Sequence, residues 1–371
     1  MRILVLTKRQ YMKKDLIDDH YGRFREIPLE LAKKGHSVQG ICLSYKVKKE
    51  STFRDGEVLW QSLNAGKLKF IGLARFISEA MKLSKSADMI WACSDSFYGI
   101  IGYALSRKYR IPLVFDLYDN FEYYFVAKLP IVKQLYHHAI CHSQAITCVS
   151  EPLENLVRNV YGKKKGVIIL ENAVRNDLFR PLDSSTCRNF LQLPEESKLI
   201  GTAGALTINR GIQYLLDAFF KLKTFHPNLH LVLAGPRDIT IPQNRQIHDL
   251  GILPLEKVPY LFNALDVAVV CVKDDEFGKY CFPQKAREIM ACDVPIVAAN
   301  VGSLQKIFPI HPEWLFDPES TDSLVRTINY RLNDRSTNYG RMPSWSELAD
   351  TFNRHIQNIY SKNLYFFTRW Q

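Results

Sequence analysis

Short apolar runs alternate with longer amphipathic stretches along most of the chain. Residues 3–7 (ILVLT) form a continuous apolar run, and residues 24–34 then carry apolar side chains at intervals of three and four. Runs of this length are typical of buried strands, whereas the three-to-four spacing is typical of helices. The alternation predicts parallel β-α-β units. Further strands are expected at 37–43, 89–92, 113–115, 145–149 and 166–170, and a further helix at 97–109.

The same pattern restarts in the second half of the chain. Residues 179–197 are rich in proline, serine and charge, which predicts a boundary between two domains. A chain of 371 residues is long enough for two cores. We therefore expect two doubly wound domains facing across a cleft, with ligands at the carboxyl ends of the strands. The second set comprises strands at 199–202, 229–234, 267–271 and 296–298, and helices at 211–222 and 258–265.

Composition narrows the class of protein without choosing a function. Hydrophobic residues make up 47% of the chain and charged residues 23%, as in globular proteins. The net charge of +11 suits nucleic acid, an anionic membrane surface or phosphorylated small molecules. The eight cysteines form no CxxC pair, which predicts reduced thiols in a cytoplasmic protein. No residue spacing predicts a metal site, and no run approaches the roughly 18 apolar residues of a membrane span.

The first candidate binding element is GALTINRG, residues 204–211, between a predicted strand and a predicted helix. Glycine lets a backbone approach a ligand closely, and a helix N-terminus offers free N–H groups to an anion. Arg210 stands just before that helix, where its guanidinium could hold a phosphate with two hydrogen bonds. The alternative is a plain turn with a solvated arginine.

The second candidate element is YCFPQKAREIMACDVPIVAANVG, residues 280–302. Lys285 and Glu288 are three residues apart at the start of a predicted helix, so they share one face. A lysine there suits an anion and a glutamate suits hydroxyl groups, which together fit a ligand that has both a diphosphate and hydroxyls. The alternative is a surface ion pair of little energetic weight.

This stretch resembles the signature of the retaining glycosyltransferases of family 4, which have the GT-B fold. FPQKAREIMACDVPIVAANVG is closest to a subgroup with the pattern P-x-K-x-x-E. Other segments resemble family regions in the same order, so the resemblance extends over nearly the whole chain. These segments are GRFREIPLELAKKGHSV, VSEPLENLV, LENAVRNDLFRP, LVLAGPRD, LGILPLEKVPYLFNALDVAVV and WSELADTFNRHIQNIY.

The resemblance implies an α/β fold of the GT-B type, with two Rossmann-like doubly wound domains. We expect an acceptor domain at 1–180, a nucleotide-sugar donor domain at 181–344, and a helix at 345–371 that returns to the first domain. The implied activity is transfer of a sugar, with retention, from a nucleotide-sugar to a glycan or lipid-linked acceptor, in polysaccharide or glycolipid synthesis. No cofactor or metal is expected.

The resemblance also implies roles for individual residues. Catalytic roles fall to Asp116, beside the donor sugar and acceptor, and to Arg210 and Lys285, which would hold the diphosphate. Glu288 would bond the donor ribose. The remaining donor-binding residues would be Gly22, Gly204, Gly251, Ile252, Tyr280, Phe282, Pro283 and Gln284.

Several positions depart from the family pattern. Tyr280 replaces the glutamate that commonly opens the signature, and Ala205 replaces a frequent arginine. Phe115 stands where a histidine is usual, and N-G-V-D is here Asn-Ala-Val-Arg at 172–175. These departures keep open an alternative, a weak or inactive nucleotide-sugar-binding protein of the GT-B fold.

The positive charge also allows a role at a membrane. Residues 67–85 predict a basic amphipathic helix whose apolar face is Phe70, Leu73, Ala74, Ile77, Ala80 and Met81. Such a helix can lie on an anionic membrane or pack on the sheet of its own domain. Peripheral association with the inner face of the membrane is therefore a hypothesis. Nucleic-acid binding is disfavoured because no zinc, helix-turn-helix or RNA-binding signature occurs, and no GxGxxG predicts a dehydrogenase.

Overall fold

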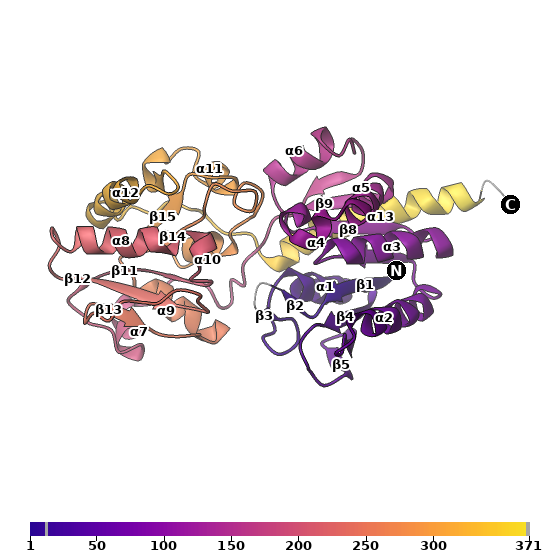
Figure 1. The fold of residues 1–371 in the computed structure, drawn as a ribbon, viewed down its shortest axis with the longest axis horizontal. Coiled ribbons are helices and arrows are strands. Elements are labelled where there is room, and N and C mark those ends of the chain that lie inside the picture. Colours follow the sequence, from indigo (N-terminus) through magenta and orange to yellow (C-terminus); the bar gives the residue numbers. More distant parts are fainter. Residues whose placement is uncertain (12–13, 369–371) are drawn as a thin grey trace. The chain divides into compact units, whose positions relative to one another are not determined.

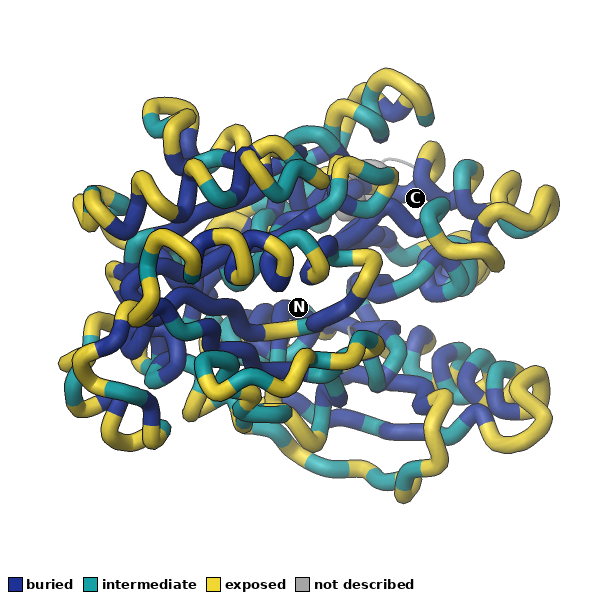
Figure 2. The backbone as a smooth tube through the Cα atoms, turned by 60° about the vertical axis from the view of Figure 1, so that its left-hand side comes forward, coloured by how far each residue is buried: buried dark blue, intermediate teal, exposed yellow. Residues whose placement is uncertain are grey.

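The computed structural model describes residues 1–11 and 14–368. The chain divides into two compact units: unit 1 contains residues 1–172 and 345–371, and unit 2 contains residues 173–344. Figure 1 shows the elements of each unit, and Figure 2 shows their buried strands and exposed helix faces. Residues 173–180, which the sequence analysis placed in the first domain, belong to unit 2. There Val174 N–H donates to Pro343 O at 3.1 Å, and Val174 forms a bridge to Ser344.

Unit 1 is built on an eight-stranded sheet with the order β10-β9-β8-β7-β1-β4-β6-β5. All its pairs are parallel except β5 with β6. The strands are β1 (Arg2–Lys8), β4 (Ser37–Ser44), β5 (Ser51–Asp55), β6 (Val58–Asn64), β7 (Met89–Ala92), β8 (Leu113–Leu117), β9 (Ala145–Cys148) and β10 (Val167–Ile169), and a separate two-stranded ribbon contains β2 (Gln10–Tyr11) and β3 (Lys14–Asp15).

The strand order reverses direction at β1, which is the topology of a doubly wound sheet. Right-handed crossovers from β1 to β4 and from β7 to β8 place their helices on opposite faces. Helix α2 contacts α3, which contacts α5, whereas α1 contacts α13. The helices of unit 1 are α1 (Arg23–Lys33), α2 (Lys69–Ser84), α3 (Ser96–Tyr109), α4 (Phe125–Lys128), α5 (Pro130–His142), α6 (Glu151–Asn159) and α13 (Trp345–Thr368).

Unit 2 has a six-stranded, fully parallel sheet with the order β13-β12-β11-β14-β15-β16. The predicted α/β class with two doubly wound sheets is confirmed. The strands are β11 (Lys198–Ala203), β12 (Leu229–Ala234), β13 (Ile247–Asp249), β14 (Val267–Val270), β15 (Ile296–Ala299) and β16 (Leu315–Phe316). The helices are α7 (Ser184–Phe190), α8 (Ile212–Leu222), α9 (Val258–Ala264), α10 (Gln284–Ala291), α11 (Ser303–Ile307) and α12 (Thr321–Asn333).

In unit 1 one feature lies outside the sequence expectations, and one expectation needs correction. The β5–β6 hairpin was not predicted, although Gly56 with φ of +56° marks its tight turn. Helix α2 exists, but its predicted apolar face is rotated: Phe70 is 68% exposed, and the fully buried helix positions are Gly72, Phe76, Ala80 and Ser84. A Cβ on Gly72 would lie 2.3 Å from the Ala65 Cα, so the close approach at Gly72 sets the rotation of the helix.

The cysteines behave as the sequence predicts. All eight are free, and all but Cys141 are buried.

Helix α13 belongs to unit 1, where it packs against α1 (Figure 1). The ring of Phe352 is fully buried and lies 5.3 Å from the Trp91 ring. Asp350 also pairs with Lys34 at 2.6 Å, and Asn353 Oδ1 lies 2.7 Å from His36 Nε2. An aromatic contact with β7 and two polar contacts with the segment between α1 and β4 therefore join this late segment to the rest of unit 1.

We predict that Phe352→Ala lowers the stability of unit 1 by about 3–5 kcal/mol, because it removes a buried aromatic ring and leaves a cavity. Urea denaturation measures the loss, and limited proteolysis reports release of α13. Gln357→Ala, at an exposed position of the same helix, is the matched control. Equal stability of the two variants would contradict the packing described here.

Candidate functional site

Three glycines meet at the carboxyl ends of neighbouring strands in unit 2. Gly204 follows β11, Gly235 follows β12 and Gly251 follows β13, with φ angles of +116°, +139° and +65°. Gly235 N–H donates to Gly251 O at 2.7 Å, and a Cβ on Gly235 would lie only 1.8 Å from Gly204 O. A side chain is therefore excluded here, and the three backbones form a continuous floor at this edge of the sheet.

Lys285 points its amine at this floor. It is the second residue of α10, and its Nζ lies 3.1 Å from the position that a Cβ on Gly204 would take. Burial and, to a smaller extent, the nearby charge of Arg210 together lower the pKa of Lys285 to about 8, while Glu288 opposes the shift. An amine crowded by a second cation gains from an anionic ligand, because the anion offsets both the lost hydration and the repulsion.

Arg210 is held beside Lys285 by the turn between β11 and α8. It ends a short 3-10 helix, Ile208–Arg210, and Gly211 follows with φ of +75°. Its guanidinium carbon lies 3.8 Å from the centre of the Phe277 ring. Asp275 Oδ1 accepts hydrogen bonds from the N–H groups of Phe277 and Gly278, at 3.0 and 2.8 Å, and so fixes the loop that carries this ring.

The first turns of α10 contain the other residues of the predicted signature. Glu288 is buried, and its Oε1 accepts a hydrogen bond from Gln284 Nε2 at 2.9 Å. Phe282 is also buried and lies under the Arg287 guanidinium, at 4.7 Å. Pro283 and Tyr280 are partly exposed at the helix entrance, and burial and the charge of Glu276 raise the pKa of Tyr280.

Ile252 is a large apolar side chain exposed at the same edge, with 68% of its surface accessible. The turn before it is fixed, because Asp249 Oδ1 accepts from Gly251 N–H at 3.0 Å and Asp249 also pairs with Arg237. The predicted donor-binding residues of unit 2 therefore gather around the carboxyl ends of β11, β12 and β13 and the start of α10.

The two predicted residues of unit 1 lie at one buried ion pair. Gly22 caps α1 with φ of +89°, and the neighbouring Arg23 donates to Asp116 Oδ1 at 2.8 Å. Thr147 also donates to Asp116, and Arg23 reaches Asn172 Oδ1 at 3.3 Å. Both charged residues are almost completely buried, so Asp116 makes no surface contact. Burial raises the pKa of Asp116 even though Arg23 and Thr147 act to lower it.

The catalytic role of Asp116 therefore stays a prediction. Its hydrogen bond with Arg23 holds the end of β8 against the start of α1. Sequence reasoning missed three partners in these sites: Gly235, Phe277 and Arg23. Gly235 lies within the LAGPRD segment that the resemblance had singled out, and Arg23 follows Gly22 directly. Phe277 had no sequence signal, since its role depends on how its loop folds over Arg210.

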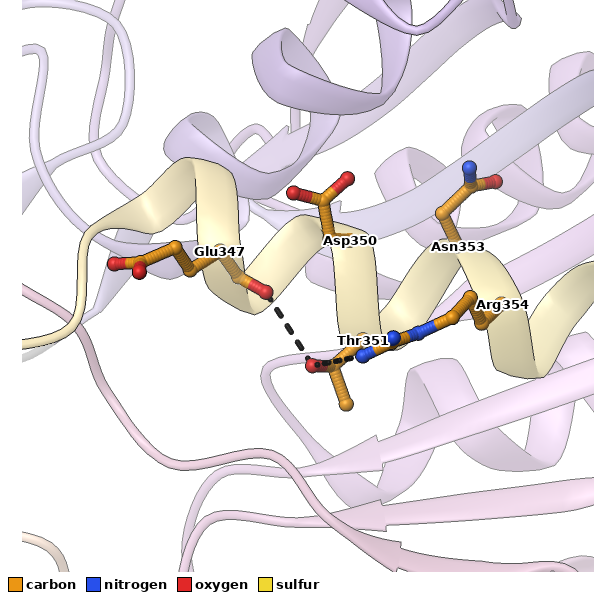
Figure 3. A pocket seen from close by; sticks show the side chains of 5 residues that line it. All are labelled: Glu347, Asp350, Thr351, Asn353 and Arg354. Carbon is orange, nitrogen blue, oxygen red and sulfur yellow. Dashed lines mark hydrogen bonds between the residues drawn. The ribbon is translucent and has the colours of Figure 1, made fainter.

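No group of three or more His, Cys, Asp or Glu side chains in 1–11 and 14–368 is placed to hold a metal ion. A shallow pocket lies along α13, lined by Glu347, Asp350, Thr351, Asn353 and Arg354 (Figure 3). Arg354 and Thr351 bond to each other on one side of the helix, and none of the predicted site residues lines this pocket.

Two families of known proteins match this chain. Residues 183–342 match the family described as glycosyl transferases group 1, and residues 24–177 match glycosyltransferase family 4. Together the two matches indicate a glycosyltransferase of the GT-B class, similar to family 4. The P-x-K-x-x-E subgroup is not distinguished by these matches and remains a prediction.

One curated relative is similar over most of the chain. A putative teichuronic acid biosynthesis glycosyltransferase, TuaC of Bacillus subtilis, is 22% identical over 90% of this chain and 83% of its own length. The matches to the first curated glycosyltransferases span only 39–50% of the length of those proteins.

Solved structures share the fold over the whole chain. Sucrose-phosphate synthase from Thermosynechococcus elongatus has a TM-score of 0.71 at 17% identity, covering 100% of this chain and 98% of that one. Anabaena Alr3699/HepE in complex with UDP-glucose has a TM-score of 0.68 at 17% identity and full coverage of both chains.

No helix in the part of the chain that the structure describes is long and apolar enough to cross a bilayer.

We predict that Asp116→Leu destabilises unit 1 by about 3–5 kcal/mol, because it leaves the buried charge of Arg23 without its partner. The double variant Arg23→Met/Asp116→Leu should recover most of that loss, since no buried charge then remains. Urea denaturation of Asp116→Leu, Arg23→Met and the double variant makes the comparison. A double variant as unstable as the sum of its single changes would contradict the assignment of Arg23 and Asp116 as a coupled pair.

A second prediction concerns the acidity of Lys285. The rate at which the Lys285 amine is acylated should increase with pH, with a midpoint at a pH of about 8. Mass spectrometry across a pH series measures this rate. Arg210→Ala should move that midpoint upward, because it removes a repelling cation, and Glu288→Gln should move it downward. Arg245→Ala, an exposed arginine of unit 2, is the control. Identical midpoints in the Arg210→Ala and Arg245→Ala variants would show that Arg210 does not act on Lys285.

Proposed function

We propose that this protein is a retaining glycosyltransferase that transfers a sugar from a nucleotide-sugar to a glycan or lipid-linked acceptor. The observation that carries the proposal is the position of the Lys285 amine. It lies against the Gly204 backbone beside Arg210, and its pKa is lowered to about 8. A nucleotide diphosphate would supply the missing negative charge at this point.

In this proposal the two cations act mainly on the leaving group. As the bond between sugar and diphosphate breaks, negative charge grows on the diphosphate oxygens. Lys285 and Arg210 are already in place to stabilise that charge, so little reorganisation is needed during the reaction. Loss of one such preorganised donor costs roughly 3–4 kcal/mol in other enzymes. Because the charge is neutralised by side chains, we expect turnover without a divalent metal ion.

Other residues of the gathered set would orient the donor. Glu288 can accept hydrogen bonds from ribose hydroxyls, and Gln284 holds its carboxylate in place. Ile252 presents an exposed apolar surface at the edge of the sheet, which suits a planar base. The partly exposed Tyr280 and Pro283 would lie toward the sugar. In unit 1, Arg23 holds together the N-terminus of α1, where Gly22 lies, and the end of β8, where Asp116 lies.

The relatives suggest which donor and acceptor to test first. A structural neighbour binds UDP-glucose, which places uridine nucleotides at the head of a donor panel. TuaC is named for teichuronic acid biosynthesis, which favours a cell-surface polysaccharide as the acceptor class. We place the protein in the cytoplasm, with peripheral association at the inner face of the membrane, where acceptors with lipid carriers would be reached.

We predict that one of UDP, GDP, ADP, dTDP and CDP binds with affinity measurable by calorimetry. Arg210→Ala and Lys285→Ala should each weaken that binding by about 1.5–3 kcal/mol, because each removes a charge-assisted hydrogen bond. Affinity should also fall as the pH rises through about 8, where Lys285 loses its proton in the free protein.

The matched control is Lys198→Ala, which removes an exposed cation from the opposite end of the same strand β11. Equal weakening in the control would mean that net charge, rather than this site, binds the nucleotide. Absence of binding to every diphosphate would overturn the proposal. Binding of a diphosphate without turnover of its sugar conjugates on any acceptor would instead favour the alternative, an inactive nucleotide-sugar-binding protein.

A further inference from the structure

Two neighbouring segments of unit 1 expose large apolar side chains where strands of the sheet end. One is the loop 45–50, which follows β4, and the other is 67–71, which follows β6 and begins α2. Val47 is 97% exposed and Phe70 is 68% exposed, values unusual for side chains of this kind. Tyr45, Leu68 and Ile71 are also exposed. We call the residues of these two segments the β4–β6 edge patch.

Hydrogen bonds and an ion pair join the two segments into one surface. Ala65 N–H donates to Ser44 O at 2.8 Å, and Lys48 N–H donates to Asn64 Oδ1 at 3.3 Å. Arg75, one turn further along α2, pairs with Glu50 at 2.9 Å. The loop therefore lies against the start of the helix, and their exposed apolar side chains share one edge of unit 1.

The patch is strongly basic. Lys46, Lys49, Lys67 and Lys69 alternate with the apolar residues, and all four are exposed. Among the residues that the structure describes, none of these four lysines has a carboxylate within ion-pair distance. The acidic residue of the segment, Glu50, is neutralised by Arg75. The surface therefore combines exposed apolar area with uncompensated positive charge.

A second group of exposed apolar residues lies at the same edge of the sheet. This second group follows β8 in the chain. Strands β4, β6 and β8 are parallel, so the carboxyl end of β8 lies at the same edge of the sheet as the carboxyl ends of β4 and β6. Helix α5 contacts α3, which contacts α2, so this group belongs to the same helix layer as the edge patch. The exposed apolar residues are Tyr124, Phe125, Val126, Leu129, Ile131 and Leu135, with Lys128 and Lys133 among them.

We propose that this edge of unit 1 docks on an anionic lipid bilayer, with Phe70 and Ile71 inserted among the headgroups. The buried side of α2 is already occupied, because Gly72, Phe76 and Ala80 pack against unit 1. The exposed side mixes lysines with aromatic and aliphatic residues, as interfacial membrane segments do. The cores of protein–protein interfaces are depleted in lysine, so the composition favours lipid over a protein partner.

The edge patch is the surface through which the proposed peripheral association with the membrane would occur. This inference rests on that proposed localisation but not on nucleotide binding. We predict that the protein floats with vesicles of phosphatidylcholine and phosphatidylglycerol and stays unbound with phosphatidylcholine alone. Each lysine near an anionic surface contributes about 1 kcal/mol, so Lys67→Gln/Lys69→Gln should reduce binding about 30-fold. Phe70→Ser/Ile71→Ser should reduce it at least about tenfold, because two side chains lose their apolar environment.

The substituted positions are exposed, so the variants should fold, and calorimetry of nucleotide binding in the same variants separates the two proposals. Phe225→Ser, an exposed phenylalanine of unit 2, and Lys198→Gln are the controls and should float like the wild type. Failure of the wild type to float, or equal flotation of the four variants, would overturn the proposal. So would a dimer in sedimentation experiments that Phe70→Ser/Ile71→Ser dissociates, because the patch would then bind a second copy.

Discussion

The Gly235 N–H donates to Gly251 O at 2.7 Å while the Gly235 Cα lies directly against Gly204 O, an approach that any side chain would block. This contact holds the ends of three strands close together. Because Gly204 has no side chain, the Lys285 amine can lie next to the position that a Cβ there would take. The turn that carries Arg210 and the entrance of α10 are then positioned around it. A Cβ at Gly204 or Gly235 would displace either a strand end or the lysine, so the chemistry of the site depends on the absence of side chains.

Unit 1 uses a buried charge where unit 2 uses bare backbone. Arg23 and Asp116 join the start of α1 to the end of β8, and Arg23 also reaches Asn172, the last residue of the unit before the chain crosses. Burial raises the pKa of Asp116, and the attraction of Arg23 opposes that shift. A buried ion pair generally adds little net stability compared with apolar residues of similar size. The physical consequence of this pair is geometric, since few other arrangements of these elements would leave both charges paired.

Sequence reasoning located most strands because each is a short apolar run buried on both faces. It also located Lys285 and Glu288, because three residues on a helix fix a shared face without reference to the rest of the fold. It failed where position depends on distant contacts. The rotation of α2 is set by Gly72 against Ala65, and Phe277 reaches Arg210 only because Asp275 shapes its loop. The boundary at 180 was misplaced by several residues, because the pairing of Val174 with Ser344 involves segments far apart in the sequence.

The positive charges of the chain thus occupy two physically different environments. Lys285 lies in a partly buried site where hydration is weak and its interactions are poorly screened by salt. Lys67 and Lys69 are exposed, so their attraction to an anionic surface falls within a Debye length of about 8–10 Å. Rising ionic strength would therefore weaken the proposed lipid contact well before it weakens the proposed diphosphate contact at Lys285. The same net charge could serve both proposed roles because burial, rather than charge count, decides how far each lysine responds to the solution.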